Sequence, residues 1–220
     1  MKKFKPFILQ LLSAALLFFM AGCSGKAGTP EPSETADTAQ TSENEDGGIY
    51  FALPAEPGER ITSEEQDFYV QTVVEGLDIP WGMAFLPNGS MLITERDGTL
   101  RLVNDGELVA EPVGAVPEVF ARNQGGLLDV TLHPDHDENG WIYISYSKPD
   151  NGTGMTAIMR ARYNSDNHTL VDMEEIYVGQ PFTDRGHHFG GRMEFDPDGY
   201  FYFAIGDRGE MNTAQDISTS

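Results

Sequence analysis

The sequence predicts an all-β fold built of repeated antiparallel units, like the blades of a β-propeller. From residue 68 onward, apolar and polar residues alternate with period two, and turn residues interrupt the pattern at short intervals. One hairpin pattern occurs three times, over residues 81–103, 126–146 and 191–207. No segment of this region has the 3.6-residue period of a long amphipathic helix.

Each copy of the hairpin pattern has a short apolar strand, a proline-containing turn, a glycine and a β-branched or aromatic strand. The turn prolines are Pro87, Pro134 and Pro197, separated by 47 and 63 residues. Antiparallel units that recur every 40 to 60 residues or so are typical of propeller blades. A β-sandwich also has many strands, but it does not repeat one hairpin at such intervals. Propellers have about four to eight blades, and residues 68–220 hold about three, so we expect the N-terminal part of a longer protein.

The N-terminus has the pattern of an export signal. Lys2, Lys3 and Lys5 precede an apolar run over residues 7–20, which is short for a membrane span. Small residues then precede Cys23, the one cysteine of the chain, which resembles a bacterial lipoprotein lipobox. The resemblance implies cleavage after residue 22, lipidation of Cys23, and anchoring to a membrane on its extracytoplasmic side. The alternative is an ordinary secretory signal peptide with an incidental cysteine.

Composition divides the remaining chain. Residues 23–48 are rich in Ser, Thr, Glu, Asp and Pro and have little apolar content, so we expect a disordered acidic tether after the lipidated cysteine. Residues 49–67 are transitional, and residues 68–220 form the predicted propeller part. The formal charge of the whole chain is −21, and beyond residue 67 the acids still outnumber the bases by 24 to nine. This excess excludes nucleic acid as a partner, because binding phosphates needs a positive face.

The densest group of candidate functional residues surrounds the third hairpin. Gly186-His187-His188-Phe189-Gly190-Gly191-Arg192 precedes its first strand, and Gly206-Asp207-Arg208-Gly209 follows its second. If the turn is symmetric about positions 197 and 198 and no bulge intervenes, His188 and Asp207 face each other with Cβ atoms about 5 Å apart. A carboxylate at that distance fixes the imidazole tautomer and leaves the other ring nitrogen basic. The alternative is a surface histidine in a salt bridge beside a glycine-rich strand.

Four segments in order resemble the soluble glucose/sorbosone dehydrogenases, also called aldose sugar dehydrogenases. They are IPWGMAFLPNG, NQGGLLDVTLHPDHDENG, HHFGGRMEFDPDG and AIGDRG, which together extend over about residues 70–210. The resemblance implies a six-bladed propeller that uses pyrroloquinoline quinone (PQQ) and calcium to oxidise an aldose to its lactone. It implies that His188 is the general base, that Asp207 orients it, and that Gln124 is a polar residue near sugar and cofactor. His187 departs from the Asp or Asn that the family often has before the base.

PQQ carries three carboxylates and needs cations, but Lys148 is the only lysine beyond residue 67. We therefore expect most cofactor ligands beyond Ser220, and a chain that alone binds PQQ poorly and is inactive. The electron acceptor and the sugar are not defined by these residues. Two other classes stay open: a metal-dependent propeller hydrolase such as a lactonase, and a non-catalytic propeller that binds a partner at the cell surface. The half EF-hand pattern at residues 135–140 favours a hairpin turn, and Trp81 is predicted to be a core residue.

Overall fold

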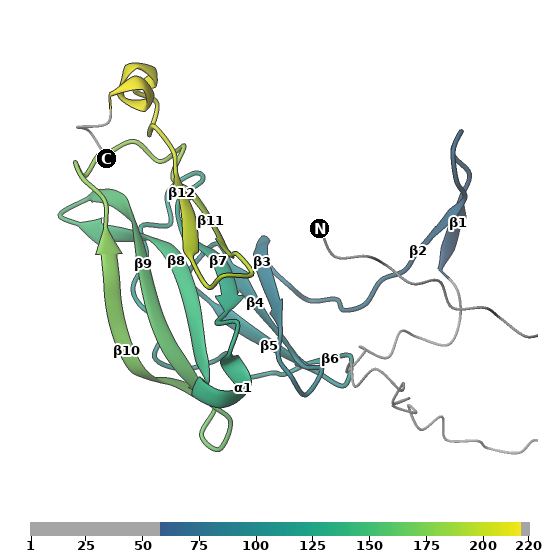
Figure 1. Ribbon diagram of the computed structural model, residues 1–220. Coiled ribbons are helices and arrows are strands. Elements are labelled where there is room, and N and C mark those ends of the chain that lie inside the picture. Colours follow the sequence, from purple (N-terminus) through teal and green to yellow (C-terminus); the bar gives the residue numbers. More distant parts are fainter. Residues whose placement is uncertain (1–57, 217–220) are drawn as a thin grey trace, which may run out of the picture. The chain divides into compact units, whose positions relative to one another are not determined.

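The computed structural model describes residues 58–216 of the chain (Figure 1). The predicted signal peptide, the lipidation site Cys23 and the tether lie outside these residues. Within them, no helix has the length and apolar character needed to cross a membrane. The helical elements are one turn of α-helix and one short 3-10 helix, namely α1 (His136–Asn139) and η1 (Met211–Gln215).

The strands form antiparallel sheets, which confirms the all-β prediction. The first two strands, β1 (Glu59–Ile61) and β2 (Phe68–Val70), pair only with each other. The next sheet contains β3 (Pro80–Phe85), β4 (Met91–Glu95), β5 (Leu100–Asn104) and β6 (Glu107–Leu108). The following sheet contains β7 (Leu127–Leu132), β8 (Trp141–Asp150), β9 (Thr153–Asn164) and β10 (Thr169–Val178). The last strands, β11 (Gly190–Phe195) and β12 (Phe201–Ile205), form a two-stranded sheet.

The two four-stranded sheets are simple meanders, in which each strand pairs with the next one along the chain. Their first strands lie side by side, because β3 packs against β7, and β7 packs against β11 of the last sheet (Figure 1). This order is typical of neighbouring propeller blades. The described residues thus contain two complete four-stranded units and one hairpin, while the number of blades in the whole protein stays a prediction.

The turns of the first and third hairpins have the same geometry. The backbone N–H of Leu86 donates to Ser90 at 2.8 Å, and that of Asp196 donates to Tyr200 at 3.0 Å. Each loop therefore holds three residues, and its last one, Gly89 or Gly199, has a φ of 85°. A left-handed residue at this position is what a three-residue hairpin loop requires, and glycine adopts it without strain. The third turn is consequently centred on Asp198 and not between residues 197 and 198, so that part of the register prediction is wrong.

A bulge recurs in the first strand of all three units. The pairing shifts by one residue between Pro80 and Met83, between Leu127 and Val130, and between Gly190 and Met193. In the first two units, a hydroxyl on the second strand lies opposite the bulge. Thr94 Oγ1 accepts the N–H of Gly82 at 2.9 Å, and Ser145 Oγ accepts the N–H of Asp129 at 2.9 Å.

The same two hydroxyls also join neighbouring sheets. Thr94 donates to the carbonyl of Leu128 at 2.5 Å, and Ser145 donates to the carbonyl of Gly191 at 2.6 Å. Each bond therefore reaches from the second strand of one unit to the first strand of the next. In the third unit, Ala204 stands opposite the bulge. An alanine has no donor for such a bond.

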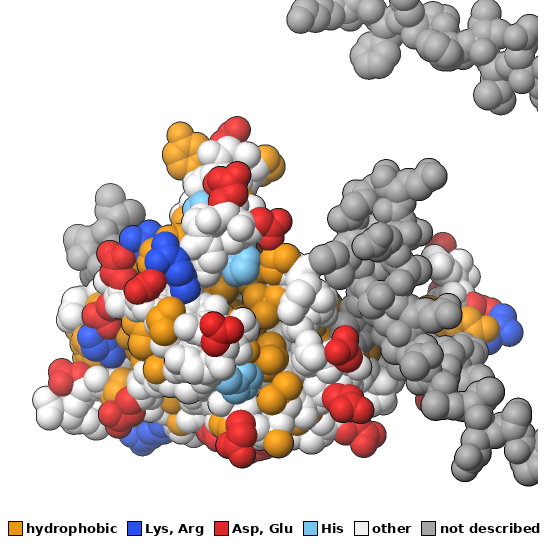
Figure 2. Space-filling view, turned by 90° about the horizontal axis from the view of Figure 1, so that it is seen from below, with side chains coloured by type: hydrophobic (Ala, Val, Ile, Leu, Met, Phe, Trp, Pro, Cys, Tyr) orange, Lys and Arg blue, Asp and Glu red, His pale blue; other side chains and the backbone are white. Residues whose placement is uncertain are grey.

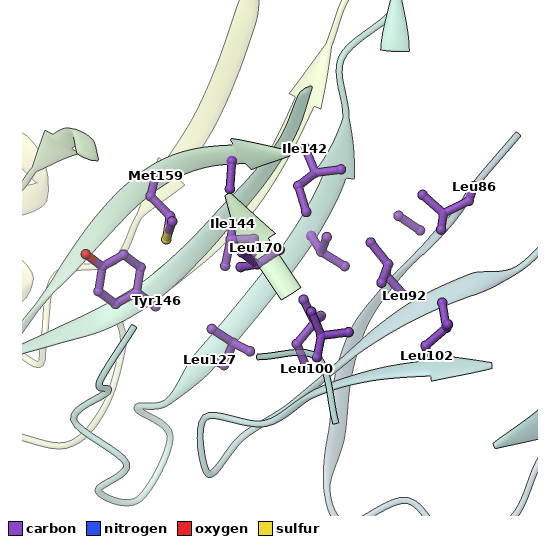
Figure 3. Packing of buried hydrophobic residues seen from close by; sticks show 14 of the residues in the cluster. Leu86, Leu92, Leu100, Leu102, Leu127, Ile142, Ile144, Tyr146, Met159 and Leu170 are labelled. Atoms are coloured by element: carbon purple, nitrogen blue, oxygen red, sulfur yellow. The ribbon is translucent and has the colours of Figure 1, made fainter. Parts of the chain in front are cut away.

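The core lies between the two four-stranded sheets. Leu92, Leu100, Leu127, Ile142 and Ile144 are fully buried there and point toward one another (Figure 3). Burying one such side chain is worth about 1.5–3 kcal/mol. Another cluster joins the β7–β10 sheet, hereafter the second sheet, to the β11–β12 hairpin. Its members are Tyr143, Ile158 and Met193 with partly buried aromatic neighbours. These contacts fix β11, and with it the start of the candidate site, against the second sheet.

Trp81 departs from its predicted role as a core residue. Its side chain is 48% exposed, and Met83 and Phe85 on the same strand are exposed as well. With Val73, Leu77 and other apolar side chains, Trp81 lines a groove of about 510 Å³. Figure 2 shows apolar side chains on one face of the molecule, interspersed with acidic ones. Trp81, Met83 and Phe85 alternate along β3, so they share one face of the sheet, and that face lines the groove.

The half EF-hand pattern is a hairpin turn, as predicted. Residues 136–139 form the single turn α1, and Gly140 ends it in the left-handed conformation. His133 Nδ1 accepts the N–H of Asp135 at 3.0 Å, so this loop bonds to itself. Across residues 58–216, no three His, Cys, Asp or Glu side chains gather closely enough to hold a metal ion.

Candidate active site

His188 lies two residues before β11, and its backbone is fixed on both sides. It has a φ of 56°, in the left-handed region that non-glycine residues seldom adopt. Its N–H donates to Gln124 Oε1 at 2.9 Å, and its carbonyl accepts the N–H of Arg208 at 3.1 Å. A residue in this strained conformation needs its surroundings to hold it, and these two bonds do so.

The imidazole of His188 contacts the carboxylate of Asp207. Nδ1 lies 2.7 Å from Oδ1, and the same oxygen accepts the N–H of Gly209 at 2.8 Å. The His188 side chain is 53% exposed and that of Asp207 is 18% exposed. The pair therefore presents the histidine to solvent and keeps the aspartate behind it.

The contact between these side chains is as predicted, but the pairing reaches it by a different route. The turn shifts the register by one residue relative to the predicted symmetry, and the bulge between Gly190 and Met193 shifts it back. Gly190 consequently pairs with Ile205, and continuing that register puts residue 188 opposite residue 207. The two departures cancel.

The protonation of the pair follows from its hydrogen bonds. The pKa of Asp207 is lowered, first by the N–H of Gly209 and then by His188, so the carboxyl is ionised at neutral pH. An ionised carboxylate only accepts hydrogen bonds, so His188 Nδ1 carries the hydrogen. In the neutral imidazole, Nε2 then has the free lone pair and is the atom that can take a proton.

Gln124 lies next to His188, on the loop before β7. Its side-chain oxygen accepts the backbone N–H of His188, and its backbone N–H donates to the carbonyl of Gly186 at 2.8 Å. Two bonds thus join this loop to the connection over residues 179–189 that carries His188, hereafter the histidine loop. Because the side-chain amide oxygen of Gln124 accepts this N–H, the NH₂ group of the same amide can donate to another partner.

Three arginines around these loops donate to backbone carbonyls. Arg96, Arg122 and Arg185 donate to the carbonyls of Asn123, Asp184 and Gly209 at 2.8, 2.9 and 2.9 Å. Arg185 also pairs with Glu210 at 2.5 Å. Only Arg185 is thereby paired with a carboxylate, since Arg96 and Arg122 donate to neutral carbonyls and keep their charge. The described residues fit the proton-accepting part of the predicted chemistry.

Further out, Arg192 follows the glycine pair on β11. Its side chain is 73% exposed and lies 3.5 Å from both Asp129 and Glu194. Asp129 itself is 4% exposed and accepts the N–H of Met193 at 2.9 Å. These contacts join β7 to β11.

Sequence reasoning missed a row of buried hydroxyls on the second sheet. Ser145, Ser147 and Thr156 are fully buried. Ser147 Oγ donates to Phe120 at 2.9 Å and accepts the N–H of Gly126 at 2.6 Å, whereas Thr156 Oγ1 donates to Phe189 at 2.6 Å. The available signal was the occurrence of hydroxyl residues inside otherwise apolar strands, since a buried hydroxyl needs a partner.

Sequence and structure comparisons extend these observations. A sequence model of the family described as Glucose / Sorbosone dehydrogenase matches residues 77–220. The chain is 41% identical over 150 residues to the aldose sugar dehydrogenase YliI of Escherichia coli, which covers 67% of this chain and 40% of that protein. The chain thus spans about two fifths of the length of this relative.

Solved structures of aldose sugar dehydrogenases are also similar to this chain. The soluble aldose sugar dehydrogenase of Escherichia coli in its apo-form is 42% identical with a TM-score of 0.62, covering 65% of this chain and 42% of that one. The PQQ-bound form of an aldose sugar dehydrogenase from Streptomyces coelicolor is 30% identical with a TM-score of 0.59, covering 67% of this chain and 43% of that one.

Proposed function

Because the chain belongs to the glucose/sorbosone dehydrogenase family, we propose that it is part of a PQQ-dependent dehydrogenase that oxidises an aldose sugar to its lactone. The observation that carries this proposal is the contact of His188 with Asp207, which leaves Nε2 as an exposed base. The similar structure from Streptomyces coelicolor, described as PQQ-bound, supports the cofactor.

In the proposed reaction, His188 Nε2 accepts the proton of the anomeric hydroxyl of the sugar. The C1–H bond breaks as a hydride leaves, and the C1–O bond becomes the carbonyl of the lactone. When bound, PQQ supplies the two-electron acceptor for that hydride. Asp207 remains ionised throughout and stabilises the imidazolium that forms on His188. The NH₂ group of Gln124 is a donor for a sugar or cofactor oxygen beside the base.

The remaining cofactor contacts belong to the longer protein in this proposal. Its relatives are more than twice as long as the matched segment. Residues 58–216 contain no group of three His, Cys, Asp or Glu side chains that could hold a metal ion. We therefore assign no ligand of PQQ carboxylates or of calcium here, and the chain alone is expected to be inactive.

The proposal also places the enzyme outside the cytoplasm. Cleavage before Cys23 and lipidation of its thiol would anchor the protein to a membrane through residues 23–48. Sugar oxidation would then take place on the extracytoplasmic side, with an electron acceptor that these residues do not define.

The test is His188→Ala in the full-length protein, assayed by dye-linked oxidation of aldoses with added PQQ and calcium. A loss of about 100- to 10,000-fold in kcat is expected, because that is the usual worth of a general base. His168→Ala is the matched control, since His168 has a similar φ of 55° but bonds to Tyr163 on the second sheet. Undiminished oxidation by His188→Ala would overturn the assignment, and lactone hydrolysis sensitive to chelation but not to PQQ removal would favour a hydrolase.

A further inference from the structure

We propose that Thr156, a buried residue of the second sheet, is a positioning residue for His188. Thr156 lies on β9 and is fully buried, so neither sugar nor cofactor can touch it. Its hydroxyl nevertheless donates to the carbonyl of Phe189, the residue after the histidine, at 2.6 Å. The kinetic part of this inference rests on the proposed dehydrogenase function, whereas the structural part does not.

The Phe189 carbonyl accepts hydrogen bonds from residues of two sheets. One comes from the Thr156 hydroxyl on β9, and the other comes from the N–H of Gly206, directly after β12, at 3.0 Å. Gly206 directly precedes Asp207, so the same oxygen ties the strand that carries the acid to the second sheet. A shift of this carbonyl would therefore move His188 and Asp207 relative to Gln124, whose loop belongs to the second sheet.

The backbone after Phe189 has little conformational preference of its own. Gly190 and Gly191 have φ values of 74° and 103°, and glycines have the greatest freedom of any residue. Hydroxyls of the second sheet hold the carbonyls on both sides of Gly190: Thr156 holds Phe189, and Ser145 holds Gly191 at 2.6 Å. The Phe189 ring adds to this hold, because it is 2% exposed and packs edge-on against Phe120.

Close neighbours of the glycines show how tightly the segment is seated. A Cβ atom at Gly191 would lie 2.7 Å from Leu128 Cδ1, and one at Gly206 would lie 2.0 Å from the carbonyl oxygen of His188. The histidine loop thus rests directly on the second sheet. Without the Thr156 hydroxyl, the Phe189 carbonyl would retain one partner and the loop would gain freedom.

The experiment compares Thr156→Val with Thr94→Val in the full-length protein. Both replace a buried threonine that donates to a carbonyl of the next unit, but Thr94 bonds to Leu128 and Gly82 and not to the histidine loop. Thr94→Val loses more hydrogen bonds, so it controls for general destabilisation. Thr156→Ser keeps the hydroxyl and is the conservative rescue.

Two readouts are expected to separate the variants. Thr156→Val lowers kcat by about 10- to 100-fold with KM changed less than about threefold, as a small misplacement of a reacting group does. It also raises hydrogen–deuterium exchange in peptides covering residues 186–192 and 206–209, measured by mass spectrometry without added substrate. Thr94→Val leaves both nearly unchanged, and Thr156→Ser restores both.

The inference is overturned if Thr156→Val changes kcat and local exchange no more than Thr94→Val does, or if Thr156→Ser fails to restore them. Local exchange that rises in Thr156→Val without any measurable oxidation in the wild type would contradict the proposed function and leave the positioning role supported. If Thr156→Val does not accumulate, Thr156→Cys replaces it, because a thiol is a weaker donor of similar shape. Its exchange in residues 186–192 must then exceed that of Thr156→Ser, or the inference fails.

Discussion

Replacing Asp207 by asparagine tests the pair at the centre of the candidate site. Asp207 Oδ1 has two partners, the Gly209 N–H at 2.8 Å and His188 Nδ1 at 2.7 Å. An asparagine oxygen can still accept one of them, and the side chain keeps its size. Asp207→Asn therefore removes the negative charge while it largely preserves the turn.

The expected fall in kcat follows from the role of the Asp207 charge beside His188. A general base contributes about 10²- to 10⁴-fold to the rate, and the base itself, His188, remains in the variant. The loss is then limited to tautomer control and to stabilisation of the imidazolium. We expect kcat to fall by about 10- to 100-fold, which is less than for His188→Ala.

The assay is dye-linked aldose oxidation by the full-length protein with PQQ and calcium, followed over pH. Asp196→Asn is a matched control on the same hairpin, because Asp196 Oδ1 accepts the N–H of Asp198 two residues on, at 3.0 Å, as Asp207 accepts that of Gly209. A kcat for Asp207→Asn equal to that of Asp196→Asn would refute the role of the carboxylate, provided both variants unfold at similar temperatures.

Further predictions concern the buried core, the charge of Asp207, the binding of PQQ and the lipid anchor at Cys23. Ile144→Ala, at a fully buried position, should lower the free energy of unfolding by about 2–5 kcal/mol in urea titrations, whereas Ile176→Ala, 40% exposed, should cost much less. Since the pKa of Asp207 is lowered from 3.8, the ionised carboxylate stabilises the fold above that value, and this contribution disappears as pH falls through the folded-state pKa. A higher free energy of unfolding in the wild type than in Asp207→Asn that persists at the lowest pH would contradict this. Isothermal titration of residues 24–220 with PQQ and calcium should show no tight binding, and sub-micromolar affinity would show that the cations are present after all. Cys23→Ala should abolish incorporation of labelled palmitate; continued labelling would exclude this cysteine as the lipid site.

Much of the architecture was predictable because period-two alternation and turn residues act locally. All three predicted hairpins occur, and the alternation around Pro87 and Pro197 leads to turns of the same geometry. The contact of His188 with Asp207 was predicted from the same turn. Its register was right only because the bulge at Gly190–Met193 compensated a one-residue error in the turn.

What the sequence did not reveal depends on contacts between units. A bulge leaves no distinct signature in one strand, since it is defined by the pairing with another. The buried hydroxyl of Thr156 reads as an ordinary strand residue until its partner, 33 positions away, is known. Trp81 was misjudged for a similar reason: an apolar side chain on a strand predicts burial, but its exposure depends on what packs against that face of the sheet.

The hydroxyl bonds between units have a consequence for how such a chain can change by mutation. Within a sheet, many backbone bonds hold each strand, and no side-chain substitution removes them. Between sheets, Thr94 and Ser145 each make a connection with a single side chain. One codon change is enough to remove such a bond while both sheets keep their strand pairing. Substitution of such a hydroxyl can thus change how firmly the loop that carries His188 is held, while the strand pairing of the sheets is kept.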